Sequence, residues 1–161
     1  IKRIGCGSNV AITHENFLDK TEIDILMVAG RYTLLDQSAS NSLFSKAIEK
    51  SVEVELASPF NSGVLASGAK DKKARFDYLP VTEEVFEKVK RIEKICNSYN
   101  VSIKCAALNY SLSHPAVKRL ILGLVDPDGL HSNISDLDVK IPNNLWQDLS
   151  ELGIQNPLGG N

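Results

Sequence analysis

Short apolar runs alternate along the chain with longer segments whose apolar residues recur every three or four positions. Four runs predict strands at residues 1–6, 23–28, 52–56 and 120–122. The run at 23–28 is almost continuous and Gly30 follows it, which is typical of a strand buried on both faces of a parallel sheet. The pattern therefore predicts four short strands, each followed by helical sequence.

The segments between these runs predict helices at residues 14–20, 40–50, 101–112 and 127–137, a helix that follows Thr82, and a last helix. Thr82 is a suitable N-cap because Glu83 and Glu84 follow it, at the end of a helix where acidic side chains are favourable. Asn143 or Asn144 is expected to cap the last helix. Residues 66–81 are expected to form a long loop and residues 157–161 a flexible tail.

Strands that alternate with helices predict parallel βα units with right-handed crossovers, hence an α/β fold. About four such units make half of a TIM-type (β/α)8 barrel, which needs about 250 residues, whereas this chain has 161. An open four-stranded sheet would expose an edge and an apolar face. Because the chain also starts at Ile1 rather than Met, we expect residues 1–161 to be one partial domain that lacks a partner half-barrel.

Composition and charge argue against several classes of function. Hydrophobic residues make up 43% of the chain and charged residues 24%, with 20 acidic and 18 basic side chains interspersed. We expect no nucleic-acid partner, because the sequence has no basic stripe, and no membrane span, because no apolar run approaches about 20 residues. Cys6, Cys96 and Cys105 have neither C-x-x-C spacing nor an even count, so reduced, packed thiols and a cytoplasmic location are expected.

The chemistry is expected at the carboxyl ends of the strands, where parallel βα folds bind their ligands. Those ends carry Gly, Ser and Asn residues, at positions 7–9, 29–32, 57–63 and 123–126. Small residues let a ligand approach the backbone, and the helix that begins after 126 offers free N–H groups to a phosphate. A nucleotide cradle is one interpretation, and ordinary turn chemistry is the other.

Five longer sequence strings, two of which include strand ends, resemble those of a known protein family. They are AGRYTLLDQSA at 29–39, PFNSGVLASG at 59–68, AAL at 106–108, HPAV at 114–117 and IPNNLW at 141–146. On these strings the chain resembles the C-terminal half of the aldo/keto reductase family, and within it the sugar dehydrogenases of the D-threo-aldose (L-fucose) and L-galactose type. The resemblance runs through nearly the whole chain in order, as βα units five to eight.

The resemblance implies an enzyme that transfers a hydride between a nicotinamide cofactor, NAD or NADP, and a sugar or related alcohol or carbonyl compound, without a metal. By position, the implied cofactor contacts are Ser8 and Asn9 at the carboxamide, Ser58, Phe60 and Ser62 at the pyrophosphate, Gly123, Leu124 and Val125 near the adenosine phosphate, and Asn133 at the adenine. The family's catalytic Asp, Tyr, Lys and His have no match here, so this segment alone is expected to be inactive.

Three positions depart from the family pattern. Ala29 stands where many members have a Gln near the carboxamide, and Ala57 stands where many stack a Tyr on the nicotinamide. Near the adenosine 2′ position the chain has Gly123 and Gly129, with Asp126 and Asp128 close by, where members that prefer NADP carry Lys or Arg. An anion disfavours a 2′-phosphate, so NAD is preferred over NADP.

Two rival functions stay open on the sequence: a non-catalytic module of the same fold that binds nicotinamide as a redox sensor, and a stand-alone half-barrel that closes by oligomerising. Arg31 and Tyr32 follow the second strand, and either substrate contact or packing would explain them. His14, His114 and His131 have spacings that fit no metal site.

Overall fold

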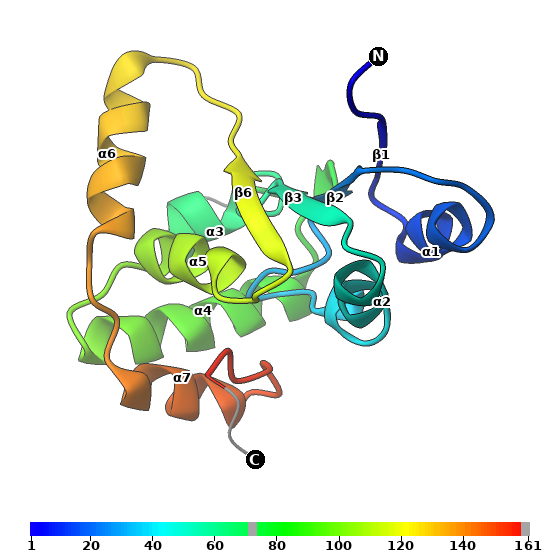
Figure 1. Cartoon of the computed structure of the whole chain (residues 1–161). Coiled ribbons are helices and arrows are strands. Elements are labelled where there is room, and N and C mark those ends of the chain that lie inside the picture. The colour runs from blue at the N-terminus through cyan, green and yellow to red at the C-terminus, as the bar shows by residue number, and fades with distance from the viewer. Residues whose placement is uncertain (71–73, 159–161) are drawn as a thin grey trace.

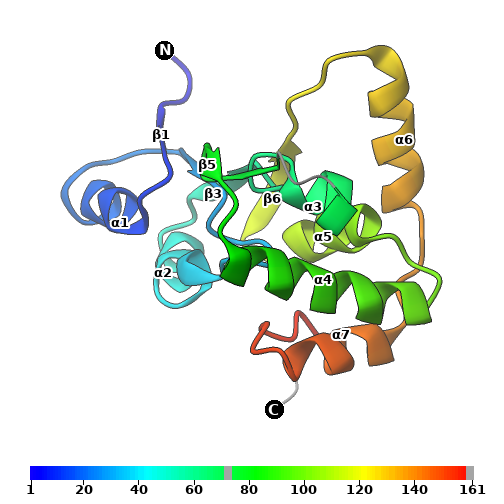
Figure 2. The same cartoon turned by 180° about the vertical axis from the view of Figure 1, so that it is seen from behind.

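A computed structural model describes residues 1–70 and 74–158 of the chain. Its centre is a parallel four-stranded sheet in the order β1 (Gly5–Ser8), β2 (Ile25–Ala29), β3 (Glu53–Ala57) and β6 (Val117–Ile121). Each strand is followed in the chain by at least one helix, and the helices gather beside and below the sheet (Figures 1 and 2). The expected α/β architecture of parallel βα units is confirmed.

Seven α-helices lie in the described part of the chain. They are α1 (Ala11–Lys20), α2 (Leu43–Glu49), α3 (Val64–Ser67), α4 (Glu83–Ser98), α5 (Ile103–Leu112), α6 (Pro127–Leu137) and α7 (Asn143–Ser150). A 3₁₀ turn at Ser38–Ser40 leads into α2. None of these helices is long and apolar enough to cross a lipid bilayer.

The two faces of the sheet differ sharply. Alternate residues of β2 and β3 point toward the helices, and Leu26, Val54 and Leu56 are completely buried there. On the opposite face Met27 is exposed, and Arg119 pairs with Glu53 and Glu55 at 3.1 and 2.8 Å across the strands. One packed face and one open, partly charged face are what half of a barrel presents when its other half is not there to fill the interior.

Both edge strands differ from the expected ranges. β1 starts at Gly5, not at residue 1, because its parallel pairing with β2 begins at the register Gly5↔Ile25. β6 starts at Val117, three residues earlier than expected, and Lys118 and Arg119 within it are exposed. The expectation of a fourth buried strand was therefore wrong: as the edge of the sheet, β6 tolerates charged residues on its open side.

Residues 66–81, expected as one long loop, carry short elements where they are described. After α3 come a 3₁₀ turn at Gly68–Lys70 and a hairpin of β4 (Arg75–Phe76) and β5 (Leu79–Pro80). Residues 71–73 of this segment, and 159–161 of the expected tail, lie outside the described residues. Two-residue strands are too short to show periodicity in sequence.

The two helix caps predicted from the sequence have different outcomes. The Thr82 hydroxyl accepts a hydrogen bond from the Val85 N–H at 3.3 Å, so Thr82 is the N-cap of α4 as predicted. Asp126 caps α6 by accepting from the Gly129 N–H at 2.7 Å. For α7 the N-cap position is Pro142 and no side chain caps the helix, so the predicted Asn cap was wrong. Packing of Leu145 and Trp146 against the core holds that helix instead.

Truncation of Leu56 tests which face of the sheet is packed. Leu56→Ala would leave a cavity between β3 and the helices, and we expect the free energy of unfolding in urea to fall by about 2–5 kcal/mol. The matched control is Ile12→Ala on the exposed side of α1, where we expect a change within about 0.5 kcal/mol. Equal losses in the two variants would contradict the assignment of the packed face.

Candidate functional site

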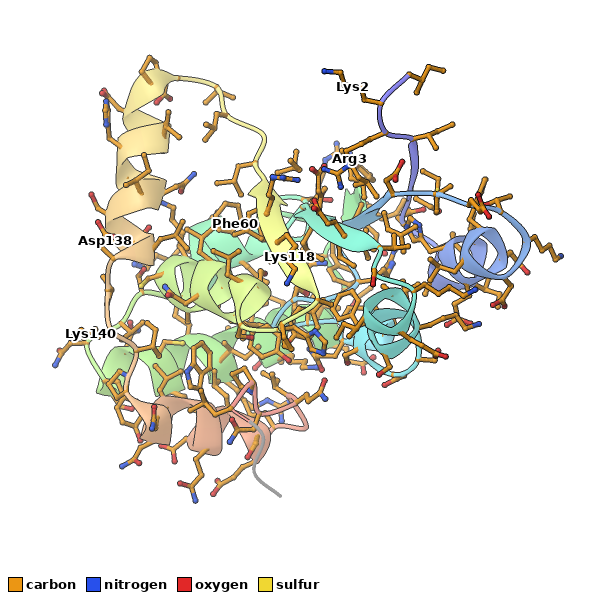
Figure 3. The ribbon with its side chains drawn as sticks, in the orientation of Figure 1. Lys2, Arg3, Phe60, Lys118, Asp138 and Lys140 are labelled. Carbon is orange, nitrogen blue, oxygen red and sulfur yellow. The ribbon has the colours of Figure 1, made fainter. Side chains whose placement is uncertain are left out.

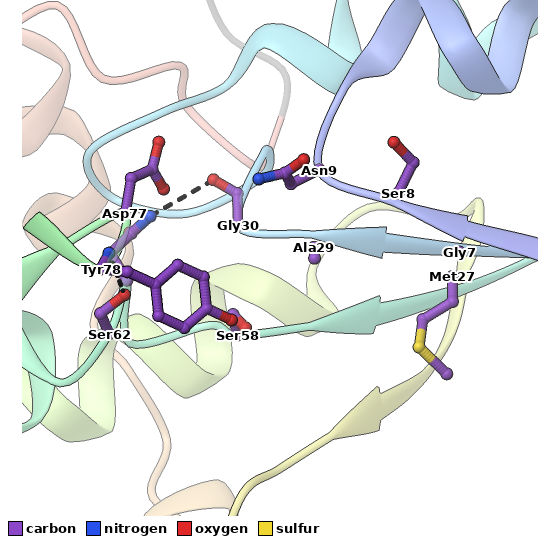
Figure 4. Close-up of a pocket in the computed structure, with 11 residues that line it drawn as sticks. Gly7, Ser8, Asn9, Met27, Ala29, Gly30, Ser58, Ser62, Asp77 and Tyr78 are labelled. Atoms are coloured by element: carbon purple, nitrogen blue, oxygen red, sulfur yellow. Dashed lines mark hydrogen bonds between the residues drawn. The ribbon is translucent and has the colours of Figure 1, made fainter.

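A cavity of about 360 Å³ opens at the carboxyl ends of β1, β2 and β3. Figure 4 shows the residues that line it: Gly7, Ser8, Asn9, Met27, Ala29, Gly30, Ser58, Asn61, Ser62, Asp77 and Tyr78. The strand ends meet because the register pairs Ser8 with Val28 and Ala29 with Ala57. This is the edge at which parallel βα folds bind ligands.

Four of the nine residues predicted for the cofactor meet in this cavity: Ser8 and Asn9 from the end of β1, and Ser58 and Ser62 from the loop after β3. Phe60 belongs to the same loop but does not line the cavity. Its side chain packs against the hydrophobic core between sheet and helices (Figure 3).

The other predicted residues lie elsewhere. Gly123, Leu124 and Val125 form the exposed connection from β6 to α6, and no atom approaches within 4 Å of the place where a Gly123 Cβ would stand. Asn133 is buried on α6. None of these four residues lines the cavity, so the structure gathers the predicted carboxamide and pyrophosphate positions but not the adenosine positions.

The loop after β3 has an unusual backbone. Ser58, Asn61 and Ser62 have φ values of 56°, 45° and 60°, and Gly63 follows with 104°. Left-handed conformations are uncommon for residues other than Gly, with Asn the most tolerant, and cost of order 1–3 kcal/mol each where the surroundings impose them. Hydrogen bonds from Asn61 N to Ser58 O (3.1 Å) and from Gly63 N to Phe60 O (3.0 Å) hold the turn.

Asn61 is the residue of this loop that sequence reasoning missed. Its side chain is 1% exposed, and its Nδ2 donates to the Gly30 carbonyl oxygen at 3.3 Å. Its Oδ1 is buried and has no hydrogen-bond partner among the described residues. The only signal in the sequence was the amide within the string PFNSG, which does not reveal that the side chain turns inward.

The hairpin of β4 and β5 borders the cavity on the side away from β1. Asp77 and Tyr78 form its two-residue turn with φ values of 48° and 67°, the geometry that suits tight hairpins. The Tyr78 N–H donates to Ser62 Oγ at 3.0 Å, and the Arg75 guanidinium donates to the Tyr78 carbonyl at 2.9 Å. The Tyr78 ring is 71% exposed and lies along the cavity (Figure 4).

Arg31 ties three separate segments to this edge of the sheet. Its guanidinium donates to the Asn9 carbonyl at 2.6 Å, to Asp36 at 2.8 Å and to Asp77 at 2.7 Å. Burial raises the pKa of Asp36, but hydrogen bonds from Ser38 and Arg31 outweigh burial and hold that pKa below its usual value. Arg31 thus joins the end of β1 to the hairpin, an architectural role that the sequence did not separate from substrate contact.

Tyr32, for which substrate contact and packing were both open, is packed. Its ring is completely buried and stacks on Tyr110 with centroids 4.9 Å apart. Phe44 meets the Tyr32 ring edge-on at 5.2 Å, and the Tyr32 hydroxyl lies 3.2 Å from Ser113 Oγ.

Within residues 1–70 and 74–158, no three His, Cys, Asp or Glu side chains gather as a metal site would require.

His14 supports the end of β1 from beneath. Its Nε2 lies 3.1 Å from the Ser8 carbonyl oxygen and its Nδ1 lies 3.4 Å from Cys6 Sγ. Because a carbonyl only accepts, Nε2 carries the proton and Nδ1 accepts from the thiol. Burial lowers the pKa of this completely buried imidazole, so at neutral pH His14 is an uncharged support for Ser8.

Comparison with known proteins decides the family. The sequence profile described as "Aldo/keto reductase family" matches residues 1–154. The chain belongs to the aldo/keto reductase family. This confirms the resemblance stated on the strings at 29–39 and 59–68.

Three curated relatives are between 23 and 32% identical to the chain over the aligned residues. They are D-threo-aldose 1-dehydrogenase from Pseudomonas sp (32% over 94% of this chain and 46% of the relative), pyridoxal 4-dehydrogenase from Microbacterium luteolum (30%, 96% and 45%) and NADH-specific methylglyoxal reductase from Escherichia coli K12 (23%, 88% and 45%). The chain thus spans about half the length of the curated relatives it matches.

Solved structures support the fold. The holo form of aldo-keto reductase AKR11C1 from Bacillus halodurans superposes with a TM-score of 0.72 at 18% identity, over 94% of this chain and 50% of that one. The apo form gives 0.68 at 17% identity, over 91% of this chain and 49% of that one. The described sheet and helices therefore have the fold of half an aldo/keto reductase barrel.

Removal of the Arg31 guanidinium should loosen the hairpin. In Arg31→Ala we expect backbone amides of Arg75–Phe76 and Leu79 to exchange with deuterium faster, with a loss of protection of about 1–2 kcal/mol, because charge-assisted hydrogen bonds to a half-exposed Asp77 are partly screened. Lys46→Ala, which breaks a surface ion pair with Asp19, is the control and should leave this exchange unchanged. Unaltered exchange in Arg31→Ala would contradict the role of Arg31 in holding the hairpin.

The buried imidazole of His14 should make stability depend on pH. The unfolded chain binds a proton at His14 below about pH 6.5, whereas the folded chain, with its lowered pKa, does not. The contribution of the neutral, buried His14 to the free energy of unfolding is thus fully present above about pH 6.5. It is lost as pH falls from there toward the pKa of His14 in the folded chain. We expect His14→Gln to flatten the decline in the free energy of unfolding between about pH 7 and pH 5; an equally steep decline would count against a neutral His14.

Proposed function

We propose that the chain is the cofactor-binding half of an oxidoreductase that transfers a hydride between a nicotinamide cofactor, NAD or NADP, and a sugar or related alcohol or carbonyl compound. The observation that carries the proposal is the meeting of Ser8, Asn9, Ser58 and Ser62 around one cavity at the carboxyl edge of the sheet. Membership of the aldo/keto reductase family supports it, as do relatives described as dehydrogenases of D-threo-aldose and pyridoxal.

The residues around the cavity fit a nicotinamide group. Ala29 and Gly30 are small and leave room beside the strand ends. A side chain at residue 30 would take up part of this room, because its Cβ would stand 3.4 Å from Asn61 Nδ2. Ser8, Asn9, Ser58 and Ser62 bring hydroxyl and amide groups to the lining, and these can hydrogen-bond to a polar ring substituent. When bound, the nicotinamide supplies the carbon that accepts or donates the hydride.

The chain's own part in the reaction is to bind and orient. Ser8 and Asn9 would hold the carboxamide end, and Ser58, Phe60 and Ser62 would follow the pyrophosphate. The resemblance implies adenosine contacts at Gly123, Leu124, Val125 and Asn133, which lie outside the lining of this cavity. His14 keeps the Ser8 carbonyl in place and Arg31 keeps the Asn9 carbonyl in place. Residues that are held in place before the ligand arrives cost little to arrange when it binds.

The proton-transfer groups of the proposed reaction lie outside this chain, in a further half-barrel that closes the sheet over Met27, Glu55 and Arg119. Two points support this division: the chain spans about half the length of its curated relatives, and the face of the sheet that would line a barrel interior is open.

Cys6, Cys96 and Cys105 form no disulfide, which suits a reducing, cytoplasmic compartment.

A comparison of two protein samples tests the proposed function. The 161-residue chain alone is expected to produce no NADH or NADPH from a panel of aldoses and pyridoxal, followed at 340 nm. The product of the complete reading frame that contains the chain is expected to reduce NAD with at least one of them. Cofactor binding without turnover by that product would favour a non-catalytic, redox-sensing module, and absence of binding would refute the proposal.

The cofactor preference has its own test. Asp126 and Asp128 flank the start of α6, so we expect NADH to bind more tightly than NADPH in a fluorescence titration. Gly123→Arg should shift the preference several-fold toward NADPH, because the open space around Gly123 admits a side chain that can pair with a 2′-phosphate. Tighter binding of NADPH to the unaltered protein would reverse the preference.

A further inference from the structure

We propose that Tyr78 is a specificity-determining residue whose ring packs against the flat face of a cyclic substrate. The inference rests on the proposed function and concerns the substrate rather than the cofactor. Its basis is an aromatic side chain that lines the cavity and is 71% exposed, on a backbone held in a left-handed conformation.

The backbone of Tyr78 is unusual for an aromatic residue. Asp77 and Tyr78 form a two-residue turn in which both φ values are positive, 48° and 67°. Turns of this kind favour Gly at the second position, and a positive φ at a bulky residue is a genuine outlier. Because such strain gathers at ligand clamps and other functional sites, a Tyr at this position calls for a role that Gly would not serve.

Three contacts hold the turn so that the ring stays beside the cavity. The Tyr78 N–H donates to Ser62 Oγ at 3.0 Å, and the Tyr78 carbonyl oxygen accepts from the Arg75 guanidinium at 2.9 Å. The Asp77 carboxylate pairs with Arg31 at 2.7 Å. All three contacts involve the backbone of Tyr78 or the side chain of Asp77, so they leave the Tyr78 ring available to a ligand.

An exposed aromatic ring on a fixed backbone is a suitable platform for another ring. The face of an aromatic ring carries partial negative charge and attracts the positive edges and C–H groups of a neighbour, and Tyr presents a large contact area with few rotatable bonds. A ligand that covers this ring also removes apolar surface from water. A cyclic aldose or a pyridine ring gains this contact, whereas an open-chain carbonyl compound has no flat face to offer.

The position of Tyr78 favours the substrate over the nicotinamide as the ring that it meets. The proposed carboxamide contacts, Ser8 and Asn9, lie at the end of β1, whereas the hairpin borders the cavity on the side away from β1 (Figure 4). At 71% exposure, against 37% for Met27, Tyr78 lies at the outer wall of the cavity. A substrate that enters from solvent meets this wall first.

The test measures steady-state kinetics and NADH binding with the product of the complete reading frame. Tyr78→Phe keeps the ring, whereas Tyr78→Ala and Tyr78→Gly remove it. Glycine adopts the conformation of residue 78 (φ 67°) freely, so the Gly variant separates loss of the ring from backbone strain and keeps the inference testable if the Ala variant fails to fold. The cyclic substrate is the aldose, or pyridoxal, that the unaltered protein oxidises with the highest kcat/KM. Methylglyoxal is the open-chain comparison.

In Tyr78→Ala and Tyr78→Gly we expect KM for the cyclic substrate to rise about three- to tenfold, the effect of one ring contact. We expect kcat to stay within about twofold, because the contact is made equally in the ground state and the transition state. Tyr78→Phe should retain the KM of the unaltered protein. The dissociation constant of NADH, and kcat/KM for methylglyoxal, should be the same in all variants.

The control is Leu79→Ala, which truncates a side chain of the same hairpin that is 68% exposed and lies outside the cavity lining. It should alter neither the KM for the cyclic substrate nor the dissociation constant of NADH. A rise in KM equal to that of Tyr78→Ala would show that the hairpin, and not the ring, is responsible, and would overturn the inference.

Three other results would also overturn the role of Tyr78: an unchanged KM in both variants without the ring, an equal loss in Tyr78→Phe, or an equal loss for methylglyoxal. Weaker NADH binding with an unchanged KM would overturn it as well, because the ring would then meet the cofactor. All of these leave the proposed function intact. Failure of the unaltered protein to bind NADH, or to turn over any member of the panel, would overturn both.

Discussion

The parallel pairing of β1, β2 and β3 is the constraint on which the site depends. Their register brings Ser8, Ala29 and Ala57 to the same edge of the sheet, so residues that are far apart in the chain surround one cavity. The pairing is held by the packed face, where Leu26 and Leu56 are excluded from water. Burial of such side chains contributes about 1.5–3 kcal/mol each, enough to keep the strand ends in place while the loops carry strain.

Hydrogen bonds to the backbone then convert this edge into a rigid rim. His14 holds the Ser8 carbonyl, Arg31 holds the Asn9 carbonyl, and Ser62 accepts from the N–H of Tyr78. Each of these contacts joins residues from different segments, so the loops restrain one another. The rim borders the cavity that Ser8, Asn9, Ser58 and Ser62 line.

The open face of the sheet links stability and function. Arg3 and Arg119 pair with Glu53 and Glu55 on this face, and charged side chains keep an uncovered sheet face compatible with water. In a closed barrel the same face would be interior. A half-barrel of this kind therefore has a cavity at one edge of the sheet and an open face beside it, consistent with a chain that spans about half the length of its relatives.

The sequence alone determined the class of fold, because the spacing of apolar runs such as 23–28 reflects burial. It also predicted local helix caps such as Thr82, because a cap depends on a neighbour three residues away. It located Ser8, Asn9, Ser58 and Ser62 at strand ends. Only the tertiary structure decided that Phe60 packs inward and that Arg31 bridges loops. The inward turn of Asn61 likewise depends on a carbonyl 31 residues away, and such contacts between distant segments leave no periodic trace in a sequence.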